Sequence, residues 1–118
     1  MFTSFENSPP VDLLPGFTAR FIHTDTQTFS LVEIEAGAIL PEHSHVHEQF
    51  SKVLEGTFEL TVDGKTRTCN VGDVALIKSH VPHSGRAITA CKIFDVFNPV
   101  REDYRKLSIP PEERSDEN

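Results

Sequence analysis

The segment GAILPEHSHVHEQFSKVLEG at residues 37–56 decides the fold of this chain and holds three of its six histidines. His43 and His45 are two residues apart, and alternate residues of a β-strand point to the same face. Such a strand can present two imidazoles to one ion. A turn after His45 would bring the side chain of Glu48 or Gln49 back towards the same point. The segment therefore indicates a metal site.

A second group of histidines, His80 and His83, follows in SHVPHSG at 79–85 and would be supplied by another strand. Imidazole nitrogen with an oxygen donor suits Zn, Ni, Fe, Mn or Cu. The alternative is a set of surface histidines on loops, but the spacing of two, the second group and the flanking glycines favour one divalent ion. His47 would join the ligands only if its strand continued without a turn, and His23 is interpreted as a strand-end residue.

Short apolar runs separated by turn residues recur along the chain. TFELTV at 57–62 alternates between apolar and polar residues, as a half-buried strand does. Asp63-Gly64 follows, a dipeptide typical of a tight hairpin. This pattern predicts an all-β fold, an antiparallel sandwich or barrel. We expect strands at residues 17–22, 28–35, 50–56, 57–62, 65–71, 74–78 and 90–97.

The composition limits the possible partners. The chain has 118 residues, with eleven Lys and Arg against eighteen Asp and Glu, for a formal charge of −7. An acidic chain disfavours nucleic acid and anionic membranes as partners, because both need a basic surface. No apolar run approaches the about 18 residues of a membrane-spanning helix. No secretory signal is visible, so a cytoplasmic location is the default expectation.

The chain length fits one domain. We expect an N-terminal arm at 1–12, a barrel at 13–101 and a charged, partly disordered C-terminal tail at 102–118. The two cysteines, Cys69 and Cys91, have no metal-ligand spacing and are interpreted as small, partly buried strand residues.

The last expected strand carries polar residues that point to function. By parity Asp95 and Phe97 share one face with two apolar residues, and a carboxylate there is unfavourable to bury unless it is paired or functional. The turn at Asn98-Pro99 would place Arg101 near the mouth of the barrel. An arginine could hold a substrate carboxylate and an aspartate could transfer protons. The alternative is a solvent-facing Asp95, a core Phe97 and a surface Arg101.

The segment at 37–56 resembles the first motif of the cupins, G-x5-H-x-H-x3-E-x6-G. The matching residues are Gly37, His43, His45, Gln49 and Gly56, with Gln49 in place of the motif's glutamate. The resemblance implies a cupin barrel, also called a jelly roll or double-stranded β-helix, with a metal inside. A glutamine can still offer its carbonyl oxygen, and a neutral ligand set favours direct binding of an anionic substrate to the ion.

The second cupin motif, G-x5-P-x-G-x2-H-x3-N, is matched less fully. Gly72 and His83 fit it, while Lys78, His80 and Ala87 replace the proline, the glycine and the asparagine. The resemblance spans roughly residues 30–98 and implies four metal ligands. They are His43, His45, Gln49 and His83. His80, at the glycine position, is interpreted as a turn residue.

HSHVHEQ at 43–49, followed by DVFNPVRED at 95–103, resembles the uronate-linearising cupins of pectin and alginate breakdown. These enzymes open 4,5-unsaturated monouronates to linear keto acids, and their functional Asp, Phe and Arg match Asp95, Phe97 and Arg101. Lys52 stands where these enzymes usually have an aromatic residue. The resemblance implies a metal-dependent enzyme for a small anionic sugar.

Two other functions stay open at this point. The same ligands could hold Fe(II) in a cupin dioxygenase, or the barrel could bind a small molecule without catalysis. We also expect a homodimer, because small cupins commonly pair through sheet edges and exposed edges invite pairing.

Overall fold

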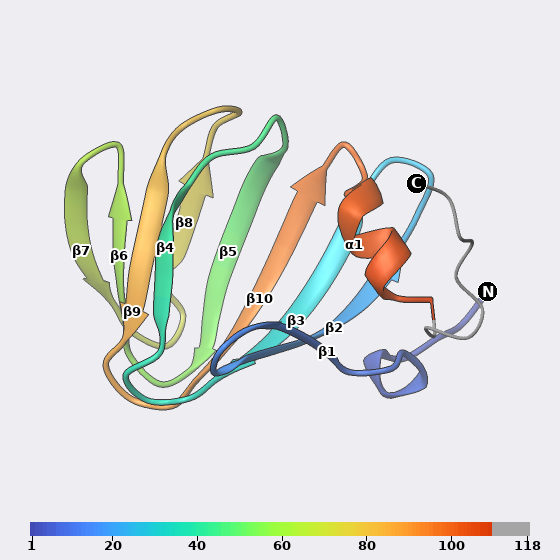
Figure 1. Cartoon of the computed structure of the whole chain (residues 1–118), viewed down its shortest axis with the longest axis horizontal. Helices are drawn as coiled ribbons and strands as arrows, with labels where there is room; N and C mark the ends of the chain where they lie inside the picture. Colours follow the sequence, from blue (N-terminus) through green and yellow to red (C-terminus); the bar gives the residue numbers. More distant parts are fainter. Residues whose placement is uncertain (110–118) are drawn as a thin grey trace.

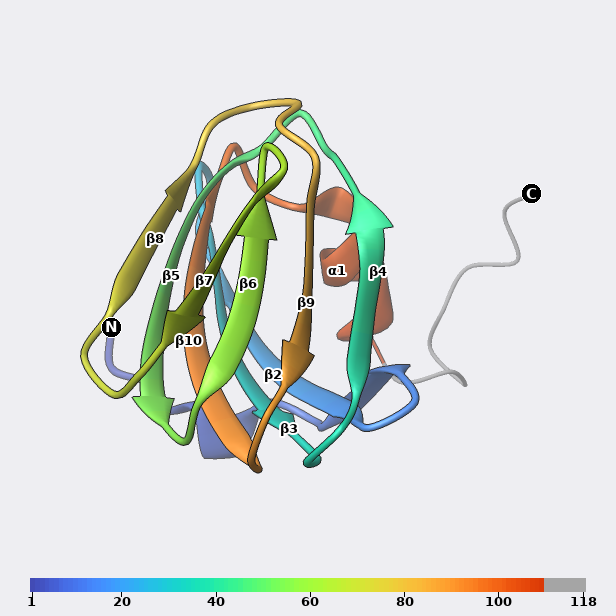
Figure 2. The same cartoon turned by 90° about the vertical axis from the view of Figure 1, so that its left-hand side faces the viewer.

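The computed structural model describes residues 1–109, whose strands form two antiparallel β-sheets that face each other (Figures 1 and 2). The larger sheet has the order β1-β2-β3-β10-β5-β8 and the smaller one the order β4-β9-β6-β7. This arrangement confirms the predicted antiparallel all-β barrel. The strands are β1 (Val11–Leu14), β2 (Phe17–His23), β3 (Thr28–Ile34), β4 (Ile39–His43), β5 (Glu48–Glu55), β6 (Phe58–Val62), β7 (Lys65–Cys69), β8 (Val74–Ile77), β9 (His83–Ala87) and β10 (Cys91–Asn98).

The core lies between the two sheets and follows the alternation seen in the sequence. In β2, β3 and β10, every second side chain is buried, and the residues between them are more exposed. Each large apolar side chain buried in this way contributes about 1.5–3 kcal/mol. The main cluster includes Phe17, Phe21, Val32, Ile34, Val53, Phe58 and Ile93.

The strand β10 lies in the middle of the larger sheet and places the predicted functional residues inside the barrel. It pairs with β3 on one side and with β5 on the other. Asp95 and Phe97 are 9% and 3% exposed, on the same inward face as Cys91 and Ile93. The predicted parity is confirmed, and a solvent-facing Asp95 is excluded. Cys91 and Cys69 are both buried strand residues with free thiols, as expected.

Three strands, β1, β4 and β9, fall outside the expected strand ranges, although the histidine pattern had suggested strands at His43 and His83. The strand β4 contains Pro41, and β9 contains Gly85, which are both residues that weaken a strand signal. Gly85 is required by close packing, because a Cβ atom there would lie 2.6 Å from Cζ of Phe58 and even closer to another ring atom. A glycine therefore allows the ring from β6 to lie against the backbone of β9.

The ends of the described chain are more ordered than the composition predicts. A short 3-10 helix, η1 (Phe5–Asn7), precedes β1, which starts inside the expected N-terminal arm. The helix α1 (Glu102–Leu107) falls in the segment expected to be a charged, partly disordered tail. Its acidic first turn and basic last turn suit the helix dipole. The part of that tail at 110–118 lies outside the described residues.

Packing explains why α1 forms. The Tyr104 ring stacks on Phe21 with 4.7 Å between centroids, and Ser108 Oγ lies 3.0 Å from His23 Nε2. The helix is thereby attached to β2, with His23 as the strand end that makes the attachment. Among residues 1–109, no helix has the length and apolar character needed to cross a membrane.

The outward face of the larger sheet carries an aromatic cluster. The rings of Phe5, Phe29 and Phe50 each lie 6.3–6.4 Å from the ring of Phe94. Lys52 also faces outward, beside Phe94 in the register, so its departure from the family pattern does not alter the interior. The predicted homodimer stays a prediction.

Two motif glycines allow a sharp test of this fold. Gly37 and Gly56 have φ of +82° and +83°, so an alanine at either position should lose about 1–2 kcal/mol of stability from backbone strain. A Cβ at Gly56 would also collide with the backbone oxygen of Ala90, whereas nothing lies within 4 Å of one at Gly37. We expect Gly56→Ala to lower the unfolding free energy by about 1–3 kcal/mol more than Gly37→Ala, as measured by urea denaturation. Equal losses would contradict this packing.

Candidate functional site

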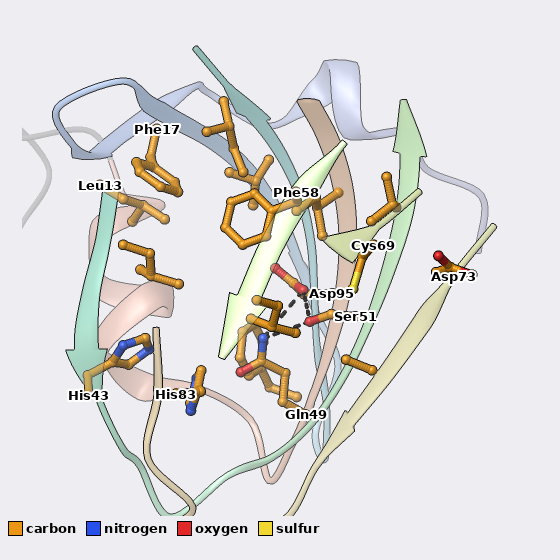
Figure 3. A pocket seen from close by; sticks show the side chains of 18 of the residues that line it. Leu13, Phe17, His43, Gln49, Ser51, Phe58, Cys69, Asp73, His83 and Asp95 are labelled. Carbon is orange, nitrogen blue, oxygen red and sulfur yellow. Dashed lines mark hydrogen bonds between the residues drawn. The ribbon is translucent and has the colours of Figure 1, made fainter. Parts of the chain in front are cut away.

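Three histidines from neighbouring parts of the smaller sheet meet inside the barrel. His43 ends β4 and His83 begins β9, directly opposite each other in the register (Figure 3). His45 lies two residues beyond the end of β4, so it does not share a strand with His43 as the spacing suggested. The ring centroids of His43 and His45 lie 4.1 Å and 5.0 Å from that of His83. One ring nitrogen of each histidine lies within 4.8 Å of the others, so the cluster could hold a metal ion.

Backbone carbonyl groups set the tautomer of all three rings. The Nδ1 atoms of His43, His45 and His83 lie 2.8–2.9 Å from the carbonyl oxygens of Pro41, His47 and Val81. A carbonyl oxygen only accepts, so each Nδ1 carries the proton and each Nε2 offers a lone pair. The Nε2 of His83 is buried and has no hydrogen-bond partner within the described part of the chain. Such an atom fits a metal ligand, whose other nitrogen is typically held by a carbonyl group.

Burial favours the neutral form of His45 and His83. It lowers the pKa of His45 to about 4, helped by the charges of Arg101 and His83, and it also lowers the pKa of His83. Neutral imidazole is the form that binds a metal. His45 and His83 can therefore bind an ion at neutral pH without first losing a proton.

Gln49, on β5, points its amide oxygen at the same cluster. Its Oε1 lies 3.1 Å from Nε2 of His45. With the proton on Nδ1, both of these atoms are acceptors, and neither can donate to the other. A cation between them resolves that conflict, and two ligands each about 2.1 Å from one ion are commonly about 3 Å apart. The position of Gln49 therefore fits the ligand role that the cupin resemblance implies.

Asp95 lies beside Gln49 on the neighbouring strand β10. Its Oδ1 accepts a hydrogen bond from Ser51 Oγ and a longer one, of 3.4 Å, from Gln49 Nε2 (dashed lines in Figure 3). Burial raises the pKa of Asp95 to about 6, although these bonds and the charge of Arg101 act in the opposite direction. A carboxyl group of this kind can hold or release a proton near neutral pH.

Arg101 is buried at the end of the chain segment that follows β10. Its guanidinium lies 3.7 Å from the ring centre of Tyr104 and 4.8 Å from that of Phe97. Nε and Nη2 donate to the two carboxylate oxygens of Asp103 at 3.1 Å and 2.7 Å. Burial would raise the pKa of Asp103, but the hydrogen bonds and charge of Arg101 hold it below its usual value. A surface Arg101 is therefore excluded.

One cavity brings most of these groups together. Of the predicted metal ligands, His43, Gln49 and His83 line it, as do all three predicted catalytic residues, Asp95, Phe97 and Arg101. The remainder of the wall is mostly apolar and includes Phe17 and Phe58 (Figure 3). Val32, Ile34, Val53 and Leu60 also line it. The site thus combines a polar end, near the histidines, with an apolar interior.

The other polar residues considered from the sequence lie outside the histidine cluster. His80 has φ of +66° in the turn before β9, which confirms it as a turn residue and explains why the family motif has glycine there. His47 packs its ring at 6.4 Å from Phe97, and Glu48 is exposed at the start of β5. Neither belongs to the group of three histidines that could hold a metal.

Sequence reasoning missed Ser51, Asp103 and Tyr104. Ser51 has the same parity as Gln49 on one strand, so its inward direction could have been inferred. Asp103 and Tyr104 belong to the helix α1, where the charged composition suggested a solvated tail. Their contacts with Arg101 depend on how α1 folds back on the barrel.

Comparison with known proteins places the chain in a family. Residues 30–97 match the family model described as "Cupin domain", and the chain belongs to the cupin family. It is similar to the "Pectin degradation protein KdgF" of Dickeya dadantii (strain 3937), with 26% identity over 102 residues, 84% of this chain and 93% of that protein. The predicted cupin fold and the resemblance to cupins of pectin breakdown are thereby confirmed.

Two solved structures extend the likeness to three dimensions. KdgF from Halomonas sp. has a TM-score of 0.82 and 27% identity, covering 88% of this chain and 97% of that one. An RmlC-like cupin from Shewanella frigidimarina NCIMB 400 also has a TM-score of 0.82, with 29% identity over 87% of this chain and 94% of that one. The whole barrel, rather than one motif, is therefore shared.

The geometry makes a prediction about metal binding. His83→Ala should weaken binding of Zn²⁺ or Ni²⁺ by more than the about 10- to 100-fold typical of a lost supporting group, because it removes a buried lone pair from the cluster. His80→Ala is the control, since His80 lies in the adjoining turn outside the cluster. Isothermal titration measures both variants, and equal affinities would contradict the assignment of His83.

Proposed function

We propose that this protein opens the ring of 4,5-unsaturated monouronates to give linear keto acids. One observation carries the proposal: the buried side chains of Asp95 and Arg101 line the same cavity as two of the clustered histidines. A barrel that only binds a ligand has no need of a carboxyl group with a pKa raised to about 6 in that position. The similarity to a pectin degradation protein adds support for a uronate as the substrate.

Arg101 is the residue that would bind the carboxylate of a small anionic substrate. The pair with Asp103 uses Nε and Nη2, which leaves the N–H groups of Nη1 for a carboxylate oxygen. Tyr104 and Phe97 pack against the guanidinium, so its position is set before the substrate arrives. The substrate would then reach into the cavity with Phe97 in its wall and Asp95 beyond.

Asp95 is the residue that would transfer the proton. It gives a proton to C4 of the double bond, while the oxygen of a water bonds to C5. That water releases a proton to solvent, and Asp95 takes up a proton from solvent to return to its acid form. The resulting hemiketal opens when the bond between C5 and the ring oxygen breaks and the C5 hydroxyl proton moves to that oxygen. Loss of one water from the hydrated C1 then leaves an aldehyde and a C5 ketone, so the net reaction is an isomerisation.

A divalent ion held by His43, His45, Gln49 and His83 would supply Lewis acid chemistry to a substrate oxygen, with no change of oxidation state. The neutral ligand set leaves the charge of such an ion uncompensated, which favours an anionic substrate. The direct roles of Asp95 and Arg101 do not depend on which divalent ion is bound.

The proposal predicts turnover of an unsaturated galacturonate monomer by the metal-loaded protein. Loss of the absorbance of the conjugated double bond measures the rate. Asp95→Asn should lower kcat by about 10²- to 10⁴-fold, because an amide cannot transfer the proton. Glu48→Gln is the matched control, since Glu48 is an exposed carboxylate beside Gln49 and should leave the rate unchanged.

A rate no faster than in buffer, with metal shown to be bound, would contradict the proposed function. An oxygen electrode separates the dioxygenase alternative. Oxygen consumption with iron, and none with zinc, would indicate that reaction instead. The uronate reaction consumes no oxygen.

A further inference from the structure

Asp95 lies between two serines that differ in one respect. In the register of the larger sheet, Ser51 of β5 is opposite Asp95 on one side and Ser30 of β3 is opposite it on the other. Both serines belong to the inward face. Ser51 donates a hydrogen bond to Asp95 Oδ1, whereas Ser30 Oγ has no partner among residues 1–109. The sheet thus provides a bonded serine and an unbonded serine next to the same carboxyl group.

Ser51 is also the link between Asp95 and the metal cluster. Gln49 Nε2 donates to Ser51 Oγ at 2.8 Å, and Gln49 Oε1 lies 3.1 Å from His45 Nε2. A continuous series of contacts therefore runs from His45 to Gln49 and on through Ser51 to Asp95. Figure 3 shows the part from Gln49 to Asp95. Every link involves side chains that are at least partly buried, where hydrogen bonds are stronger than in water.

The donor and the acceptor are determined in the hydrogen bonds from Gln49 to Ser51 and from Ser51 to Asp95. An amide NH₂ group only donates, so Ser51 Oγ receives the Gln49 bond on a lone pair and has its single proton left for Asp95. Turning the Gln49 amide over would place its oxygen against the acceptor Asp95 Oδ1, and would draw the single Ser51 proton away from Asp95. The amide oxygen is therefore held on the side of His45. The orientation of Gln49 follows from Ser51 and Asp95 together.

We propose that Ser51 is a positioning residue that couples the metal ligand Gln49 to the acid Asp95. It holds the Gln49 oxygen towards the histidine cluster and keeps Oδ1 of Asp95 as a permanent acceptor. Oδ2 is then the oxygen that exchanges a proton with the substrate. The effect on the ligand stands on the hydrogen bonds alone, while the effect on proton transfer rests on the proposed function.

The contact between Gln49 Nε2 and Asp95 Oδ1 would remain after the Ser51 hydroxyl is removed. At 3.4 Å this contact is long for a hydrogen bond, so it restrains the amide only weakly once Ser51 is lost. Gln49 and Asp95 would each keep their backbone position and lose their fixed side-chain orientation. We expect the loss of about 10- to 100-fold that is typical of removing a group behind a metal ligand.

The test compares Ser51→Ala with Ser30→Ala, which delete the same hydroxyl group on opposite sides of Asp95. Ser51→Ala should weaken binding of Zn²⁺ by about 10-fold or more in isothermal titration, and Ser30→Ala should not. With unsaturated galacturonate, Ser51→Ala should lower kcat by about 10- to 100-fold and leave KM near the wild-type value, because Arg101 is untouched. Ser51→Thr, which keeps the hydroxyl, should restore both properties.

The outcomes separate this inference from the proposed function. If the wild-type protein turns over the uronate and Ser51→Ala matches Ser30→Ala in metal affinity and kcat, the inference is wrong and the function stands. If the wild-type protein shows no turnover, the proposed function is wrong, and the zinc affinities of the two variants decide the inference alone. A rise in KM with unchanged kcat, or failure of Ser51→Thr to restore metal affinity, would also overturn it.

Discussion

A carboxyl group inside a β-barrel must be hydrogen-bonded, and this requirement organises the site. Asp95 lies on the central strand of the larger sheet, where an unpaired polar group would cost about 1–3 kcal/mol. Both of its side-chain donors, Ser51 and Gln49, come from the adjacent strand β5. Pairing of β5 with β10 therefore satisfies the buried acid and also places Gln49, whose oxygen faces the histidine cluster. The register between β5 and β10 therefore determines which polar side chains meet in the site.

This arrangement explains why the chain has glutamine where the cupin motif has glutamate. A glutamate at position 49 would bring a second carboxylate to within hydrogen-bond distance of Asp95, and like charges at that separation raise each other's pKa. An amide offers an oxygen to the histidine cluster and a donor to Asp95 at the same time. The departure from the motif is therefore a consequence of the acid on β10. The glutamine at position 49 is explained only when Asp95 on the neighbouring strand is considered with it.

The sequence predicts most of the strands and the motif residues of the site, but not all of the contacts between them. Period-two alternation predicts most strands and the inward face of Asp95, because burial of alternate side chains is a local property. The strands β4 and β9 fall outside the strand ranges expected from propensity, because β4 contains Pro41 and β9 contains Gly85. The carbonyl oxygen of Pro41 contacts His43 Nδ1, and Gly85 makes room for the Phe58 ring. Motif spacing picks out His43, His45, Gln49 and His83 as candidate metal ligands, and the structure brings the three histidines together. The bond from Ser51 to Asp95 depends on which strands are neighbours, which no local pattern records.

The charge of the cavity cannot be inferred from the net charge of the chain or from Arg101 alone. The acidic composition disfavours anionic partners, and Arg101 suggests a positive cavity, but Asp103 neutralises this arginine with two hydrogen bonds. Any net positive field in the cavity would then have to come from an ion with neutral ligands. Arg101 contributes direction more than charge, because Tyr104 and Phe97 hold the plane of its guanidinium and Asp103 occupies one edge. Only the remaining N–H groups can select a ligand, and they select by geometry, which suits one carboxylate and not an extended polyanion.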